Sequence, residues 1–231
     1  MSASGLVLSY RRIGNLPAIV GNMIASGLIT DVVVAHNDPD RPLSHRDFPD
    51  LPREQIIILN SGANRYTYGR FLALPACQHD MVLTCDDDVL QLDWHGILET
   101  FRQHPESIVA AMPPGHRRHH AKLAWETARE ILLGWGAAFD RRWAVPAFEP
   151  YIARHGHDKV LERKADRLFS ILLDRLHTVL DARFVELPGA RQAGLALCTL
   201  PDHSCLNDLA RTRALAILRA LRRRQHEEVP A

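Results

Sequence analysis

The alternation of short apolar strands with helical segments in the first 90 residues is the feature that most restricts the fold. Runs rich in apolar and β-branched residues predict four strands, at Leu6–Tyr10, Val32–Ala35, Ile56–Leu59 and Met81–Cys85. Residues 15–26, between the first two strands, carry apolar side chains at helical spacing. Repeated strand-helix units predict an α/β fold with a mostly parallel central sheet flanked by helices.

The second half of the chain has a different pattern. Residues 163–180 carry an apolar stripe at helical spacing, and residues 206–224 form a second helical pattern with many arginines. We expect one domain over residues 1–231. Its first half, 1–112, contains the strand-helix units, and its second half, 113–231, ends in the basic helix.

The composition excludes several functional classes. Lys plus Arg number 28 and Asp plus Glu number 27, so the net charge of +1 provides no field for a nucleic-acid partner. No apolar run is long enough to cross a membrane, and the N-terminus lacks the pattern of a signal peptide. The four cysteines have no metal-site spacing and are expected to be free thiols in a reducing cytoplasm. The sequence leaves the oligomeric state open.

Three consecutive acids, Asp86, Asp87 and Asp88, directly follow the fourth predicted strand. Their carboxylates repel one another unless a cation shares the site. Because side chains alternate along a strand, Asp86 and Asp88 are expected to face one way and Asp87 the other. Two oxygen ligands suit Mn²⁺ or Mg²⁺ that is also bound by a substrate diphosphate. The metal would assist the reaction by neutralising the charge of that diphosphate as it leaves. The alternative interpretation is a solvated acidic turn.

Several motifs, in order, resemble those of a GT-A-fold glycosyltransferase, specifically glycosyltransferase family 64, the exostosin-like catalytic domain. The resemblance covers residues 6–218. It rests on Leu8–Arg12, Val32–Asn37, Asn64–Tyr66, Leu83–Val89, Gly134–Phe139 and Ala165–Leu168. The first three resemble the strand ends and the Asn-Arg-aromatic segment. The last three resemble the family's Asp-Asp-Asp motif, its Thr-Gly-Ala-Ala-Phe strand and its catalytic helix start.

The resemblance implies a metal-dependent, retaining glycosyltransferase that uses Mn²⁺ and a UDP-sugar, an N-acetylhexosamine or hexose donor. It implies a glycan, lipid-linked or small-molecule acceptor, with residues 1–112 as the nucleotide-binding half and residues 113–231 as the acceptor-side half. The implied nucleotide-binding residues are Ser9, Arg12, Asn37, Asn64, Asp86 and Asp87, and the implied metal ligands are Asp88 and Asp86. Asp166 would lie beside the transferred sugar, and Arg211 would reach the diphosphate. In place of the family's Asn-Cys-Glu-Asp, this chain has Arg163-Lys164-Ala165-Asp166.

Other interpretations of these residues remain open at this point. Asp166 could cap a helix, Arg211 could be one charge of a solvated helix face, and His203 could contact a metal or phosphate. The cationic loop His116–His120 could cover the site or be solvated. The basic terminal helix could pack internally or touch an anionic membrane surface, which would place the protein peripherally at the inner face of the membrane.

Two other functions are compatible with a sheet of this type. One is a sugar-phosphate nucleotidyltransferase, although the turn Ser9–Gly14 lacks the glycine-rich phosphate loop that such an enzyme needs after its first strand. The other is an inactive nucleotide-sugar-binding module. A phosphohydrolase would need its nucleophilic Asp after the first strand, whereas the three acids here follow the fourth.

Overall fold

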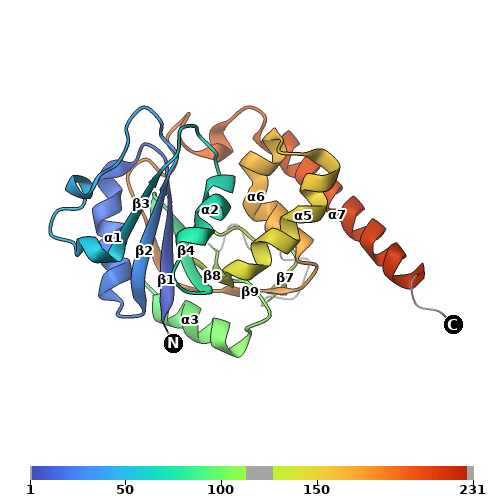
Figure 1. Cartoon of the computed structure of the whole chain (residues 1–231), viewed down its shortest axis with the longest axis horizontal. Helices are drawn as coiled ribbons and strands as arrows, with labels where there is room; N and C mark the ends of the chain where they lie inside the picture. The colour runs from blue at the N-terminus through green and yellow to red at the C-terminus, as the bar shows by residue number, and fades with distance from the viewer. Residues whose placement is uncertain (1, 113–126, 228–231) are drawn as a thin grey trace.

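The computed structural model describes residues 2–112 and 127–227, and within them an eight-stranded sheet forms the centre of the molecule (Figure 1). The strand order is β3-β2-β1-β4-β8-β6-β9-β7. Its strands are β1 (Ala3–Ser9), β2 (Ile29–His36), β3 (Ile56–Asn60), β4 (Met81–Asp86), β6 (Val109–Ala111), β7 (Thr127–Ala128), β8 (Ala137–Asp140) and β9 (His177–Leu180). A separate antiparallel pair consists of β5 (Val89–Gln91) and β10 (Phe184–Glu186).

The sheet is mostly parallel. Strands β3, β2, β1 and β4 run in one direction, and β6 and β9 are parallel to each other. Strand β8 is antiparallel to both its neighbours, β4 and β6. It comes from the second half of the chain but lies between two strands of the first half. The α/β class with a mostly parallel central sheet is therefore confirmed.

Helices cover both faces of the sheet (Figure 1). One face packs against α1 (Leu16–Ala25) and α3 (Trp94–Gln103), and the other against α2 (Tyr68–Ala73), α5 (Ala144–His155) and α6 (Lys159–Leu172). The long helix α7 (His203–Glu227) packs along α6 and then projects beyond the body of the molecule. No helix of residues 2–112 and 127–227 is long and apolar enough to cross a membrane.

Alternation along the strands produces the two hydrophobic cores. Leu6 of β1 faces the core under α2 and α6, which contains Phe71 and Phe169, whereas the next residue, Val7, faces the core under α1 and α3. The β-branched runs used to predict strands are thus buried on both faces, as expected for central parallel strands.

The predicted helix at 163–180 is wrong at its C-terminal end. Helix α6 ends at Leu172, Asp174 adopts a left-handed backbone with φ of 50°, and residues 177–180 form β9 beside β6. The β-branched pair Thr178 and Val179 favours the strand, although the same apolar residues also fit a helical stripe. Neither β5 nor α5 was predicted. The His116–His120 loop lies outside the described residues.

Candidate functional site

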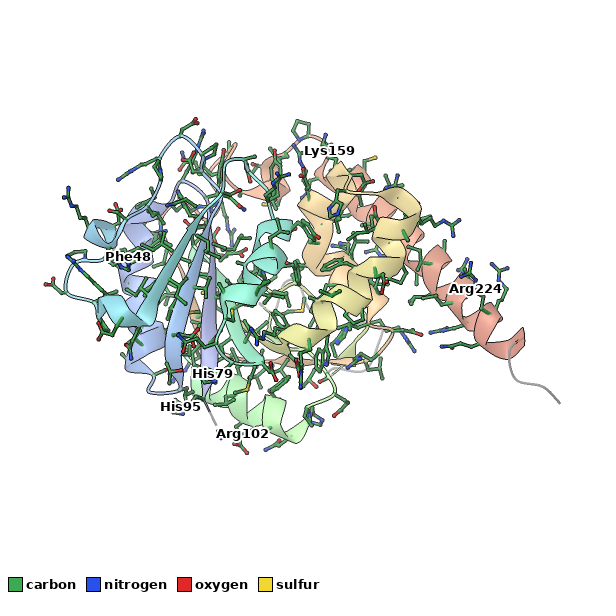
Figure 2. All side chains as sticks on the ribbon, viewed as in Figure 1. Phe48, His79, His95, Arg102, Lys159 and Arg224 are labelled. Atoms are coloured by element: carbon green, nitrogen blue, oxygen red, sulfur yellow. The ribbon has the colours of Figure 1, made fainter. Side chains whose placement is uncertain are left out.

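A cavity of about 350 Å³ lies beyond the carboxyl ends of β1 and β4. In Figure 1 the N-terminus lies below the sheet, so β1 to β4 end at the top of the view. Figure 2 labels Lys159, at the start of α6, at that same edge. The charged side chains that line the cavity are Arg12, Asp86, Asp87, Asp88, Arg163, Lys164, Asp166, Arg167 and Glu186. This is the edge at which open parallel sheets bind ligands.

The three acids adopt a turn rather than an extended strand. Asp86 is the last residue of β4, while Asp87 and Asp88 form the turn that leads into β5. The prediction that Asp87 points away from Asp86 and Asp88 assumed that the strand continues through all three residues, and that assumption is wrong. In the structure, each carboxylate is instead positioned by the arginine or backbone group that it contacts.

Asp87 is bound on both oxygens by the loop that follows β1. The backbone N–H of Tyr10 donates to Oδ2 at 2.5 Å, and Arg12 Nη1 donates to Oδ1 at 2.7 Å. Burial raises the pKa of Asp87 to about 6, although the charge of Arg12 opposes that shift. Asp87 therefore joins two loops at the site and offers its oxygens to the protein itself.

Asp86 and Asp88 each face an arginine through one oxygen. Arg70 Nη2 lies 2.5 Å from Asp86 Oδ1, and Arg12 Nη2 lies 3.2 Å from Asp88 Oδ2. Burial raises the pKa of Asp88 to about 7, and the charge of Asp86 adds to the shift. The two carboxylates are thus close enough to repel each other, which is the electrostatic condition that a divalent cation relieves.

Gly134 makes room for the carboxylate of Asp86. A Cβ atom at residue 134 would lie 2.3 Å from Asp86 Oδ2, closer than two such atoms can approach. The carbonyl of Gly134 also accepts a hydrogen bond of 2.9 Å from the backbone N–H of Asp86. The first glycine of the Gly134–Phe139 motif therefore shapes the acidic turn.

Arg70 is a residue of the candidate site that sequence reasoning missed. It lies on α2 with a fully buried side chain, and its guanidinium joins Asp86 to Asp166, whose Oδ1 is 3.4 Å from Arg70 Nε. Arg70 also contacts Thr84 of β4. Although burial opposes its charge, Asp166 and Asp86 raise the pKa of Arg70. A cation inside an otherwise apolar helix, just before three acids, is the signal that could have identified it.

Asp166 lies inside α6 and is 5% exposed. The capping interpretation is wrong, because Asp158 is the N-cap of α6 and the carboxylate of Asp166 accepts from Arg70 and from the N–H of Leu133 rather than from an N–H of its own helix. Burial raises the pKa of Asp166 to about 6, while Arg70 favours its charged form. Asp166 is therefore a buried carboxylate at the wall of the cavity, held by Arg70.

The structure brings most of the predicted site residues together, but not all of them. Asn37 and Asn64 line the cavity, and both support the loop at Tyr66, through its carbonyl and its N–H respectively. Ser9 is fully buried, pairs with His36 at 3.0 Å and is not among the lining residues.

Arg211 also lies outside the lining. It is held by Glu130 at 2.9 Å and by Asp208 at 3.3 Å, which belongs to the same helix. His203, by contrast, lines the cavity. The order of residues in the sequence could not distinguish which side of α7 faces the site.

The acidic turn supplies two suitable ligands for a divalent cation. Within residues 2–112 and 127–227, no group of three or more His, Cys, Asp or Glu side chains is arranged to hold a metal. The ion pairs with arginine use Oδ1 of Asp86 and Oδ2 of Asp88, so each carboxylate retains a second oxygen. Two carboxylate oxygens fit Mn²⁺ or Mg²⁺ when a diphosphate and water complete the coordination. The residues present therefore fit a metal that is shared with a substrate.

Comparisons with known proteins identify the fold. The sequence matches no protein-family model and no curated protein. Among solved structures, TarS from S. aureus has a TM-score of 0.52 at 13% identity, covering 81% of this chain and 60% of that one. TarS in complex with UDP has a TM-score of 0.51 at 14% identity, covering 78% and 58%. Both of these structures contain residues 1–349 of TarS, so this chain spans about 60% of that segment, and it spans 37% of the longer TarS structure.

A second similar structure is 4-diphosphocytidyl-2C-methyl-D-erythritol synthase from Anaerococcus prevotii. Its TM-score is 0.57 at 13% identity, and the match covers 91% of this chain and 98% of that one. At such low identities the likeness concerns the fold alone. The predicted GT-A fold, the fold of nucleotide-diphospho-sugar transferases, is confirmed.

Proposed function

We propose that this chain is a metal-dependent glycosyltransferase that takes its sugar from a UDP-sugar donor. The observation that carries the proposal is the meeting of Asp86, Asp88 and Asp166 at one cavity, with Arg70 between Asp86 and Asp166. A transferase of this kind needs a site for a diphosphate-bound metal next to a carboxylate that faces the transferred sugar. The cavity at the carboxyl ends of the parallel strands, with these carboxylates in its lining, supports the proposal and would accommodate both.

Asp86 and Asp88 would hold Mn²⁺ or Mg²⁺, which supplies positive charge to the departing diphosphate when bound. Arg12 and Arg70 position these carboxylates through the contacts described above. Asn37 and Asn64 line the same cavity and would contact the nucleoside, for which TarS in complex with UDP is the supporting precedent in this fold. Ser9 and Asp87 would support the nucleoside site indirectly, through His36 and Arg12.

Asp166 would act on the sugar. Its ionised carboxylate would stabilise positive charge that develops at the anomeric carbon, and it would orient the acceptor hydroxyl. Arg70 would maintain that ionised form, because it is the cation that contacts Asp166. Retention at the anomeric carbon and membership of glycosyltransferase family 64 are proposed from the motifs around Asn64, Asp86 and Asp166. Arg211 would reach the diphosphate only after leaving Glu130.

The acceptor is proposed to be a glycan or a lipid-linked molecule. The apolar side chains Leu132, Trp135, Leu195 and Leu197 share the cavity with the charged residues and would contact its uncharged part. The projecting end of α7 carries exposed Arg223 and Arg224, which would favour contact with an anionic membrane surface in a cytoplasmic protein. Figure 2 labels Arg224 near the tip of this helix.

The proposal is tested by UDP release from UDP-N-acetylhexosamines and UDP-hexoses, with and without Mn²⁺. We expect slow hydrolysis of one donor, loss of that activity with EDTA, and a decrease on the order of 100-fold in Asp88→Asn. Asp40→Asn is the matched control, because the Asp40 side chain is 79% exposed and contacts only the loop after β1. Activity that is indifferent to Mn²⁺ and to Asp88→Asn would contradict the proposal.

The second candidate function is nucleotidyl transfer, which the extensive match to the diphosphocytidyl synthase favours. Against it stands the turn after β1. Tyr10 and Arg12 of that turn are engaged by Asp87 rather than arranged as a phosphate loop, and Arg11 has a φ of 65°. Exchange of labelled pyrophosphate into CTP or UTP in the presence of a sugar phosphate would establish this function in place of the first.

A further inference from the structure

We propose that Lys164 binds a phosphoryl group of a substrate at the end of the cavity formed by α6 and the start of α7. The proposal rests on the proposed function for the identity of the substrate but not for the existence of the subsite. Two sources could supply the phosphoryl group, the diphosphate of the donor and a phosphorylated acceptor. The chemistry of recognition is the same for both.

The first argument is that Lys164 is a buried cation with a neutral partner. It is 6% exposed, and its Nζ lies 2.8 Å from Nδ1 of His203. In the part of the chain that the structure describes, no carboxylate lies within ion-pair distance of Lys164. An ammonium group withdrawn from water without a counter-ion is unfavourable, so an incoming anion gains more there than at a solvated lysine.

The neighbouring carboxylates are already paired with other cations. Asp202 contacts Lys159 and Arg163, with Arg163 Nη1 at 2.7 Å. Glu130 contacts both Arg167 and Arg211. Lys164 therefore has no ion-pair partner of its own among the described residues, although the charge of Asp202 offsets part of the effect of burial on its pKa.

The second argument is that the backbone is bent to place Lys164 at the cavity. Its φ of −130° and ψ of 25° depart from helical values inside α6. The hydroxyl of Thr67 causes the bend by entering the helical ladder. It donates to the carbonyl of Glu162 at 3.1 Å and accepts from the N–H of Ala165 at 3.0 Å. Because of the bend, Lys164 lines the cavity together with Arg163 and Arg167.

The third argument is the orientation of the ammonium group by His203. A lysine ammonium can only donate, so Nδ1 of His203 accepts and the ring proton must lie on Nε2. The ring also has a backbone hydrogen bond at Leu197, which fixes its orientation. His203 is the first residue of α7, and the acid directly before it, Asp202, is already paired with Lys159 and Arg163.

The test is isothermal titration calorimetry of Lys164→Met with four probes. Uridine reports the nucleoside site, UDP reports the donor diphosphate, and inorganic phosphate reports the bare subsite. Glycerol 3-phosphate, added with saturating UDP and Mn²⁺, reports a phosphorylated acceptor. We expect Lys164→Met to weaken at least one phosphorylated probe by about tenfold or more and to leave uridine unchanged. Lys164→Arg should retain most of the affinity.

Lys159→Met is the matched control, because Lys159 lies on the same helix but is largely exposed and paired with Asp202. Weakened UDP binding assigns the subsite to the donor, and weakened glycerol 3-phosphate binding assigns it to the acceptor. The proposal is overturned if Lys164→Met binds every phosphorylated probe as the wild type does, or if it loses uridine equally. If the wild type binds phosphate through Lys164 but neither uridine nor UDP, the proposed function fails and this subsite stands.

Discussion

The two ends of the cavity balance their charges in opposite ways. At the turn after β4, three acids are matched by the arginines Arg12 and Arg70 at distances of 2.5 to 3.2 Å. At the bend of α6, Lys164 has a neutral histidine as its partner. The carboxylates of the acidic end are therefore held in place before any ligand arrives, but they outnumber their arginines and would accept a divalent cation, whereas the basic end has a cation that an anion would satisfy.

The two ends therefore contribute differently to a binding site. The arginines hold the carboxylates in place, so the acidic end is preorganised for a metal and for the sugar. The basic end carries an electrostatic cost in the free protein that would be recovered on binding. Removing the arginine of the acidic end should therefore lower the free energy of unfolding, whereas removing the lysine of the basic end should raise it.

The largest effect is expected from Arg70→Met. This change leaves Asp86 and Asp166 without their shared cation, and Asp166 is buried, so the free energy of unfolding should fall by about 3–5 kcal/mol. Denaturant unfolding measures it. The exposed Arg65, paired with Glu162, provides the control Arg65→Met, which should change stability by less than about 1 kcal/mol. If Arg70→Met and Arg65→Met lowered the free energy of unfolding equally, the argument that Arg70 stabilises buried carboxylates would be contradicted.

A smaller, pH-dependent effect is expected from Asp166→Asn. The pKa of Asp166 is raised to about 6 in the folded protein, so between pH 6 and its ordinary value of 3.8 the folded state binds more protons than the unfolded state. The contribution of this carboxyl to the free energy of unfolding therefore rises as the pH falls from 6 to 3.8, by up to about 3 kcal/mol. The stability difference between wild type and Asp166→Asn should change accordingly from pH 7 to pH 4. A difference that is constant with pH would contradict the burial argument.

The smallest effect is expected from Lys164→Met in the absence of ligand. Burial lowers the pKa of Lys164 to about 8 from 10.5, so between these values the unfolded state binds more protons. The wild type should gain stability from this group as the pH rises from 8 to 10, and Lys164→Met should not. At pH 7 the variant should be the more stable by about 1 kcal/mol, since solvent screens part of the cost. A less stable variant would mean that Lys164 serves the fold instead.

The sequence predicted the sheet well because central parallel strands are buried on both faces. The runs at Val32–Ala35 and Met81–Cys85 contain few polar residues for that reason, and they also placed the acidic turn at the correct edge. The prediction failed at residues 177–180, where Thr178 and Val179 fit both a helical stripe and a short strand. Pairing with β6, which is distant in sequence, decided in favour of the strand.

Sequence reasoning named the acids of the cavity and one of the cations, Arg12, but it missed Arg70. Asp86, Asp88 and Asp166 carry recognisable local patterns, whereas Arg70 acts through two carboxylates at 16 and 96 residues' separation. The other predicted cation, Arg211, lies outside the cavity lining, because the register of α7 against α6 depends on packing that the sequence does not display. The partner of a buried charge can lie far away in the sequence, so local periodicity cannot reveal it.

The insertion of β8 between β4 and β6 means that neither half of the chain can be excised as an independent folding unit. A fragment ending at residue 112 would leave an unpaired edge on β4 and would leave β6 without both of its neighbours, β8 and β9, so that their backbone N–H and C=O groups would be open to other chains. Such a fragment should aggregate rather than bind nucleotide. Splitting, fusing or permuting this protein must therefore keep Ala137–Asp140 together with the strands that flank it.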